Sequence, residues 1–187
     1  MKTLVIITHP NIEASTVNKT WADALARHPE QFELHQLYKV YPNLAFDVAT
    51  EQALLAQHQR IIFQFPLHWY STPFALKKYV DEVFAYGWAF GPGGTQLKGK
   101  QVGFAISTGG KEAAYQNGAS IASLLSHFTL TFRYCGCAIA PTHLFYGAMF
   151  EPTQAALAAN AQAYIRTFTQ TQQKSPESHQ GVLKHNS

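Results

Sequence analysis

The chain has 187 residues, of which 47% are hydrophobic and 13% are charged, and its formal net charge is +3. This length suits one domain with a substantial core, and the small, scattered positive charge argues against nucleic acid as a partner. The apolar run near the N-terminus stops at His9 after four residues, which is too short for a signal peptide, and no run approaches the length of a membrane span. We therefore expect a soluble, cytoplasmic protein.

Short apolar runs alternate with helical patterns along the chain. The expected strands are Leu4–Ile7, Phe32–Tyr38, Ile61–Phe65, Val102–Ser107 and Cys137–Phe145. The expected helices are Ser15–Leu25, Val48–His58, Thr72 to about Tyr86, Ile121–Phe132 and Pro152–Phe168. This alternation predicts an α/β fold in which helices cover both faces of a parallel sheet. We expect one domain over residues 1–169 and a solvated, disordered tail over residues 170–187.

Local signals define the ends of two helices. Thr72 and Pro73 are expected at the N-cap and first helical position, and Gly136 is expected at a helix C-cap. The two cysteines flank Gly136, with no second Cys pair at zinc-site spacing, and the nine His are dispersed. We therefore expect buried structural thiols and no metal site.

The loop after the central strand is the strongest candidate for a ligand site. Ile61–Phe65 has the continuous apolar character of a strand buried on both faces, and Pro66 ends it because proline has no N–H for a ladder. His68, Trp69 and Tyr70 then stand in a row. At the carboxyl end of a central strand, these residues suit one wall of a ligand crevice. The alternative is that the aromatic pair packs on a neighbouring loop.

The loop after the first strand offers hydroxyls and amides at a helix start. It has no glycine, so it is neither a Walker A loop nor a Gly-x-Gly-x-x-Gly fingerprint. Ser15 is expected at the N-cap, with Thr16 and Asn18 in the first turn, where free N–H groups and the helix dipole favour an anion. An ordinary capped helix is the alternative interpretation.

A family resemblance rests on these motifs taken together. Pro66-Leu67-His68-Trp69-Tyr70-Ser71-x-Pro73, followed by a helix and the segment 86–91, resembles the signature of the flavodoxin-like NAD(P)H:quinone oxidoreductases. The chain is most similar to the short bacterial branch that includes the ancillary flavoprotein of glutathione-gated potassium efflux antiporters. The resemblance runs from about Leu4 to Pro141 and includes Tyr41-Pro42 and residues 47–52. It implies a flavodoxin-like three-layer sandwich whose five-stranded parallel sheet has the order 2-1-3-4-5.

The resemblance also implies the residues of a flavin site. The expected contacts to the flavin phosphate are His9, Ser15, Thr16, Val17 and Asn18. The expected contacts along the isoalloxazine edge are Pro66, Leu67, His68, Trp69 and Tyr70. The expected contacts to the pyrimidine side of the ring are Ser107, Thr108, Gly109 and Gly110. Tyr115 is the expected catalytic residue, helping to accept charge on hydride transfer, with plain packing as the alternative. The family's histidine six residues later is replaced by Ile121, so that relay is not preserved.

The function implied is two-electron transfer from NAD(P)H through FMN, or alternatively FAD, to a quinone by a ping-pong mechanism. The family forms homodimers, and the Gly87–Gly99 loop is the candidate for completing the partner's pocket. A second interpretation is a regulatory, ancillary subunit of a potassium efflux antiporter, peripheral at the inner face of the membrane. A third is an electron-transfer flavodoxin, which the basic charge and the His9-Pro10 loop disfavour.

Overall fold

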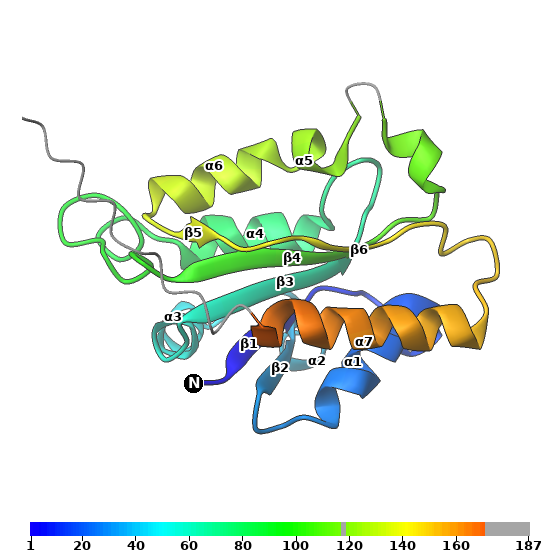
Figure 1. Ribbon diagram of the computed structural model, residues 1–187. Coiled ribbons are helices and arrows are strands. Elements are labelled where there is room, and N and C mark those ends of the chain that lie inside the picture. Colours follow the sequence, from blue (N-terminus) through cyan, green and yellow to red (C-terminus); the bar gives the residue numbers. More distant parts are fainter. Residues whose placement is uncertain (117–118, 171–187) are drawn as a thin grey trace, which may run out of the picture.

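The computed structural model describes residues 1–116 and 119–170 (Figure 1). The strands are β1 (Thr3–Ile7), β2 (Phe32–Gln36), β3 (Arg60–Pro66), β4 (Gln101–Ser107), β5 (Ala138–Ile139) and β6 (His143–Phe145). The α-helices are α1 (Thr16–Ala26), α2 (Leu37–Val40), α3 (Val48–Ala56), α4 (Phe74–Val83), α5 (Ile121–Leu124), α6 (Ser126–Tyr134) and α7 (Gln154–Gln170). Two short 3₁₀ helices, η1 (Ile12–Ala14) and η2 (Glu112–Tyr115), lie in loops. Of the expected tail, only Gln170 is described, and it ends α7.

The strands form a parallel sheet in the order β2-β1-β3-β4-β5, and β6 also pairs with β4. The predicted flavodoxin-like order is therefore confirmed. In the register, Ile7 lies beside Gln64, and Pro66 lies beside Ser107. Hence β1, β3 and β4 end at the same edge, and the loops that follow them meet there.

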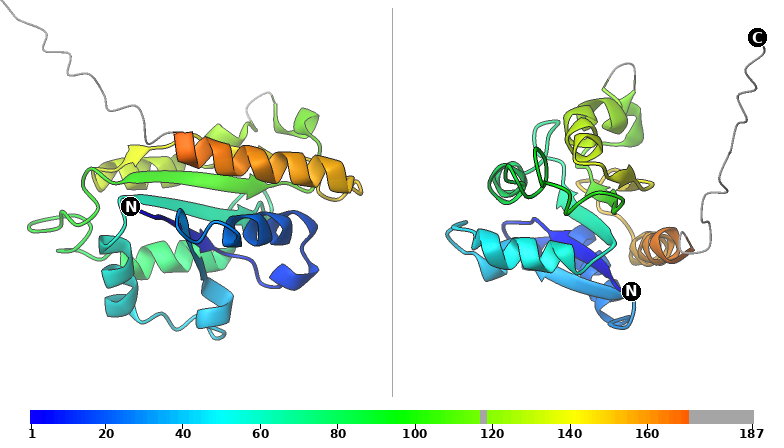
Figure 2. Two further views of the ribbon diagram at one scale, coloured as in Figure 1. Left: turned by 60° about the horizontal axis from the view of Figure 1, so that its bottom comes forward. Right: turned by 90° about the vertical axis from the view of Figure 1, so that its left-hand side faces the viewer.

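Helices cover both faces of the sheet, giving three layers (Figure 2). Alternate strand residues point to opposite faces, and two hydrophobic clusters result. Leu4, Ile61 and Phe104 belong to the cluster under α3, α4, α5 and α6. Val5 and Ile62 belong to the other cluster, under α1 and α7. Burial of β1 and β3 on both faces explains why their sequences are continuous apolar runs.

The expected fifth strand, Cys137–Phe145, was wrong as a single element. It is divided into β5 and β6, both paired with β4, because Pro141 between them has no N–H for the ladder. The second strand ends at Gln36 rather than Tyr38, where the chain turns into α2. The helix expected over residues 48–58 ends at Ala56.

Two helix ends differ from the sequence-based prediction in detail. Pro73 is the N-cap of α4 rather than its first residue, and Thr72 is buried without capping the helix. The helix expected from Ile121 to Phe132 consists of α5 and α6, which meet at Leu125. Gly136 follows the C-cap residue with φ of 80° and ends α6. Its N–H donates to the Arg133 carbonyl, as in a Schellman motif.

Both cysteines are buried free thiols, as the sequence predicted. Burial and the neighbouring Cys135 raise the pKa of Cys137 to about 12, so it stays a thiol at neutral pH. In residues 1–116 and 119–170, no group of three or more His, Cys, Asp or Glu is placed to hold a metal ion. Within the same residues, no helix combines the length and apolar character that crossing a bilayer requires.

The Tyr41-Pro42 segment is held by a buried carboxylate rather than by a ligand. Glu51 of α3 is fully buried, and it accepts hydrogen bonds from the hydroxyls of Tyr41 at 2.7 Å and Tyr79 at 2.9 Å. Burial alone would raise the pKa of Glu51, but the bonds from His35 and Tyr41 hold it below its ordinary value. These residues therefore join β2, α3 and α4 away from the loops that follow β1, β3 and β4.

Candidate functional site

Three loops meet at the carboxyl edge of the sheet: the first loop (residues 8–18), the second loop (66–70) and the third loop (107–110). The backbone N–H of Leu67 donates to the Ser107 carbonyl at 2.8 Å, which joins the second and third loops. The Asn18 side-chain amide donates to Ser107 Oγ at 2.9 Å, which joins the first and third. The three sequence-predicted segments are thus brought together through Ser107.

The first loop ends in a capped helix. Ser15 Oγ accepts from the Asn18 N–H at 3.1 Å, which confirms Ser15 as the N-cap of α1. The first N–H groups of a helix have no intrahelical partner. The N–H groups of Thr16 and Val17 are therefore free of intrahelical partners at the N-terminal end of α1, where the helix dipole favours an anion. The Val17 side chain is buried in the core, so only its backbone faces this position.

Asn18 is the centre of a buried polar network beneath the first loop. The side-chain amide of Gln64 in β3 donates to the Asn18 backbone carbonyl at 3.0 Å. The backbone carbonyl of Gln64 accepts from the Thr8 N–H at 2.8 Å. Three buried oxygens of this network, Thr8 Oγ1, Asn18 Oδ1 and Gln64 Oε1, have no hydrogen-bond partner among the described residues. Buried polar atoms are normally satisfied, so this edge of the sheet needs a ligand or ordered water.

The second loop contains a two-residue turn with an unusual backbone. His68 and Ser71 exchange two backbone hydrogen bonds of 2.9 Å each. The residues between them, Trp69 and Tyr70, have φ of 46° and 62°. Positive φ at both central positions defines a type I′ turn, which normally takes Asn and Gly. Trp69 is 95% exposed and Tyr70 56% exposed, so packing does not explain why large aromatic residues occupy strained positions.

The third loop is anchored by the segment 147–149, which follows β6. In the third loop, the Thr108 carbonyl accepts from the Ala148 N–H at 2.8 Å, and the Gly110 carbonyl accepts from the Gly147 N–H at 2.7 Å. A Cβ on Gly109 would lie 2.7 Å from Met149 Sδ. Met149 is a flexible side chain that is 81% exposed, so it could move aside, and this contact alone does not require glycine at position 109. The N–H groups of Gly109 and Gly110 have no partner within the described part of the chain.

Tyr115 belongs to an aromatic cluster that connects the loops. Its ring centroid lies 6.4 Å from that of Tyr70 in the second loop and 5.7 Å from that of Tyr146 after β6. Its hydroxyl lies 3.3 Å from the position that a Cβ on Gly110 would take. Tyr115 is half-buried and packs against the core cluster of β1, β3 and β4. Ile121, in contrast, is buried in the core.

Electrostatic coupling connects the first two loops. The pKa of His9 is lowered by burial and by the nearby His68, and its Nδ1 accepts from the Asn11 N–H at 3.1 Å. His68 itself is exposed. The pKa of Tyr146 is raised by burial and by the neighbouring Glu112 and Tyr115.

The sequence did not identify three residues of this edge: Gln64, Tyr146 and Met149. Gln64 is the polar residue within an otherwise apolar strand, and that contrast was a usable signal. Tyr146 and Met149 follow β6, whose pairing with β4 brings them beside the third loop. No local pattern marks them, because their position depends on the interruption at Pro141.

Comparisons with known proteins identify the class. A model of the flavodoxin-like fold matches residues 1–168. The chain is 46% identical over 153 residues to a Bacillus subtilis protein named Uncharacterized NAD(P)H oxidoreductase YrkL, covering 80% of this chain and 87% of that one. The chain therefore belongs to the flavodoxin-like family.

Two solved structures are also similar. General stress protein 14 of Treponema denticola, solved in complex with FMN, is 40% identical with a TM-score of 0.82, covering 88% of this chain and 96% of that one. An NADPH-quinone reductase from P. pentosaceus is 30% identical with a TM-score of 0.80, covering 90% of this chain and 98% of that one.

Proposed function

We propose that this protein is an FMN-dependent NAD(P)H oxidoreductase that reduces a quinone. The observation that carries the proposal is the meeting of the three loops at one sheet edge, tied together through Ser107. The relatives support it, since one is named an NAD(P)H oxidoreductase, one was solved with FMN and one is named an NADPH-quinone reductase. When bound, the flavin supplies the hydride and two-electron chemistry.

The residues at the edge fit the parts of FMN. The start of α1 offers the N–H groups of Thr16 and Val17 and the Ser15 and Thr16 hydroxyls, which suit a phosphate. The buried network around Asn18 has unsatisfied oxygens beside this position, and the ribityl hydroxyls, directly or through water, are donors of the type it lacks. His9 completes this end of the site.

The second and third loops would orient the ring. The N–H groups of Trp69 and Tyr70 have no partner among the described residues, and the strained turn holds them in place. Together with the N–H groups of Gly109 and Gly110, they are the donors that a flavin edge with several acceptors needs. The Tyr70 and Trp69 side chains would pack against the flavin ring, and this contact would cover their exposed faces.

Tyr115 is proposed as the catalytic residue. Its half-buried hydroxyl lies beside Gly110, where it can donate to negative charge that develops on the pyrimidine side of the ring. Such a donor stabilises charge best when it is already oriented, and contacts with Tyr70 and Tyr146 hold the Tyr115 ring in place.

The donor and acceptor are proposed to use the same face of the flavin in turn. If the second and third loops hold one face of the ring open to a single substrate, NAD(P)H must leave before the quinone enters. Initial-rate plots at several quinone concentrations should therefore give parallel lines. Intersecting lines would mean that both substrates bind together and would contradict the shared slot.

A homodimer is proposed as well, formed through the surface between α4 and α6. This surface exposes Phe74, Tyr86, Leu130 and Tyr134, with exposed fractions from 63% to 76%. Beside them, Phe90 of the loop between α4 and β4 lines a cavity of about 460 Å³. Leu130 and Tyr134 line the same cavity, and grouped exposed apolar residues of this kind mark interfaces. Light scattering of purified protein should give twice the chain mass, and replacing Tyr134 with Lys should shift it to the monomer mass.

The direct test of the proposed function is the mass of the flavin released from the purified protein. FMN is expected, and FAD would show that the site extends beyond the first loop. The matched variants are Ser15→Ala and Thr153→Ala. Ser15→Ala removes the hydroxyl that accepts from the Asn18 N–H at the site, and Thr153→Ala removes the hydroxyl that accepts from the Ala156 N–H at the start of α7. The first should lower flavin content and the second should not. Absence of any flavin, even after incubation with FMN, would overturn the proposal.

A further inference from the structure

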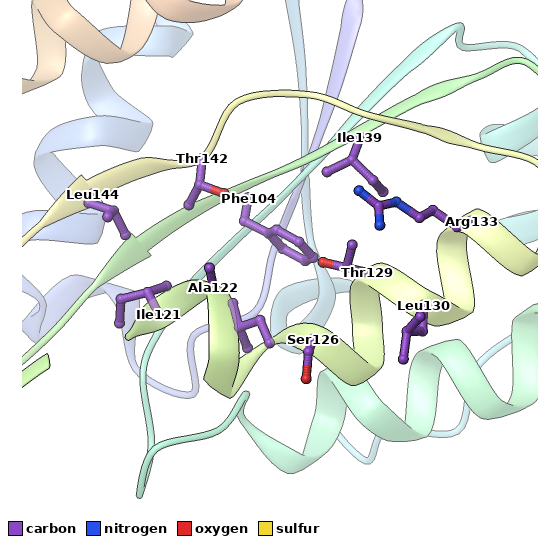
Figure 3. A pocket seen from close by; sticks show the side chains of 11 residues that line it. Phe104, Ile121, Ala122, Ser126, Thr129, Leu130, Arg133, Ile139, Thr142 and Leu144 are labelled. Carbon is purple, nitrogen blue, oxygen red and sulfur yellow. The ribbon is translucent and has the colours of Figure 1, made fainter. Parts of the chain in front are cut away.

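A cavity of about 500 Å³ lies between α6 and the edge of the sheet formed by β5 and β6 (Figure 3). Pockets of this size hold small organic ligands. Its apolar wall is formed by Phe104 of β4, Ile121 and Leu125 at the α5–α6 junction, and Ile139 and Leu144 of β5 and β6. None of these residues belongs to the three loops of the flavin site.

The lining carries a single charge, which is positive. The Arg133 side chain extends from the last turn of α6 toward Ile139 (Figure 3). Within residues 1–116 and 119–170, no carboxylate pairs with Arg133 and no hydrogen bond satisfies its guanidinium. The hydroxyls of Thr129 and Thr142, which also line the cavity, have no side-chain hydrogen bond among the same residues.

These features define what the cavity can recognise. Burial of an apolar body against the five wall residues is favourable by the hydrophobic effect. A guanidinium presents a planar fork that matches a carboxylate with two parallel hydrogen bonds. Arg133 is exposed, as an unpaired cation must be, so a carboxylate can reach it without displacing another partner.

We propose that this cavity binds an alkyl carboxylate of the fatty-acid type. The chain lies against Phe104 and the aliphatic wall, and the carboxylate pairs with Arg133, with Thr129 as a further donor. Four of the five apolar wall residues are aliphatic, which suits an alkyl chain. One guanidinium balances one carboxylate charge, whereas a phosphate monoester would keep excess charge. The proposal does not depend on the function proposed for the other edge of the molecule.

The test uses the full chain with its flavin and decanoate below its micelle concentration as the probe. Calorimetry should show one decanoate bound per chain. Methyl NMR shifts should appear at Ile121, Leu125, Ile139 and Leu144. Decan-1-ol and decyltrimethylammonium, which keep the chain but lack the anion, should bind at least about tenfold more weakly, since charge-assisted hydrogen bonds are lost.

Matched variants separate the charge from the cavity. Arg133→Gln should weaken decanoate binding about tenfold or more, whereas Arg166→Gln, at an exposed arginine on α7 across the sheet, should leave it unchanged. Ala122→Trp should block binding by filling the cavity, because Ala122 is an exposed residue of its lining. Flavin content and circular dichroism verify that each variant is folded. If Arg133→Gln does not fold, decanoate binding by Ala122→Trp tests the proposal instead.

Several results would overturn the proposal. These are absence of decanoate binding, equal affinity for decan-1-ol, unchanged decanoate affinity in Arg133→Gln, or methyl shifts confined to the flavin site. Decanoate binding that appears only when the protein is diluted to monomers would show that a second copy covers the cavity, and would also overturn it.

Discussion

The strained turn of the second loop allows a prediction in which stability and function change in opposite directions. A residue in the left-handed region costs about 1–2 kcal/mol, and Trp69 has φ of 46°. Asn tolerates this conformation well. Because Trp69 is 95% exposed, replacing it forfeits only about 0.3 kcal/mol of burial, taking roughly 5% of about 250 Å² at about 25 cal/mol/Å². Trp69→Asn should therefore stabilise the flavin-free protein by about 1 kcal/mol.

The assay is equilibrium unfolding of the flavin-free protein in urea. The midpoint should rise without a change in slope, and Tm should rise by about 2–4 °C. Val40→Asn is the control, since Val40 is also an exposed hydrophobic residue, at 49%, but lies in helical conformation in α2 and outside the proposed dimer surface. That variant should be no more stable than the parent protein.

The same Trp69→Asn variant should bind FMN more weakly, because an aromatic contact worth about 0.5–1.5 kcal/mol is lost. The dissociation constant should rise about two- to tenfold. A Trp69→Asn protein that is not stabilised would refute the assignment of backbone strain. A Trp69→Asn protein that is stabilised, binds FMN with unchanged affinity and has its FMN reduced by NADPH at the parent rate would refute the link between strain and function.

Further substitutions test other parts of the site. Ser15→Ala and Asn18→Ala should each weaken FMN binding by about 1–3 kcal/mol, as measured by fluorescence titration; unchanged affinity in both would exclude the start of α1 as the phosphate site. Tyr115→Phe should slow flavin reduction by NADPH about 30-fold, the lower end of what one lost hydrogen bond to developing charge costs, and a Phe variant as fast as the parent in stopped flow would assign Tyr115 to packing. Gly109→Ala should leave the urea midpoint nearly unchanged, because its Cβ would lie 2.7 Å from Met149 Sδ, at the end of an exposed side chain that can move; a large loss that Met149→Ala restores would show instead that Met149 is held in place.

The fold was largely predictable because burial on both faces leaves a clear pattern. Ile61–Phe65 is apolar except for Gln64, Pro66 ends the run, and the resemblance supplied the strand order. The errors occurred where tertiary pairing overrides local signals. Pro141 divides the last strand while both halves still pair with β4. Thr72 is a good capping residue by type, but it is buried and caps nothing.

The candidate site was predictable where it follows directly from strand ends. The first, second and third loops come after β1, β3 and β4, and a parallel sheet brings such loops to one edge. Backbone conformation was not predictable, since Trp69 and Tyr70 are poor residues for a type I′ turn. Nor were Tyr146 and Met149, because their place beside Tyr115 and Gly109 depends on how β6 pairs.

The central claim is that the three loops hold a flavin that accepts electrons from NAD(P)H and passes them to a quinone. The most direct measurement is anaerobic stopped-flow absorbance of the FMN-loaded protein. One equivalent of NADPH should bleach the blue flavin band within a turnover time, and one equivalent of benzoquinone should then restore it completely. A flavin band that NADPH and NADH leave unchanged, in protein shown to contain bound FMN, would contradict the account.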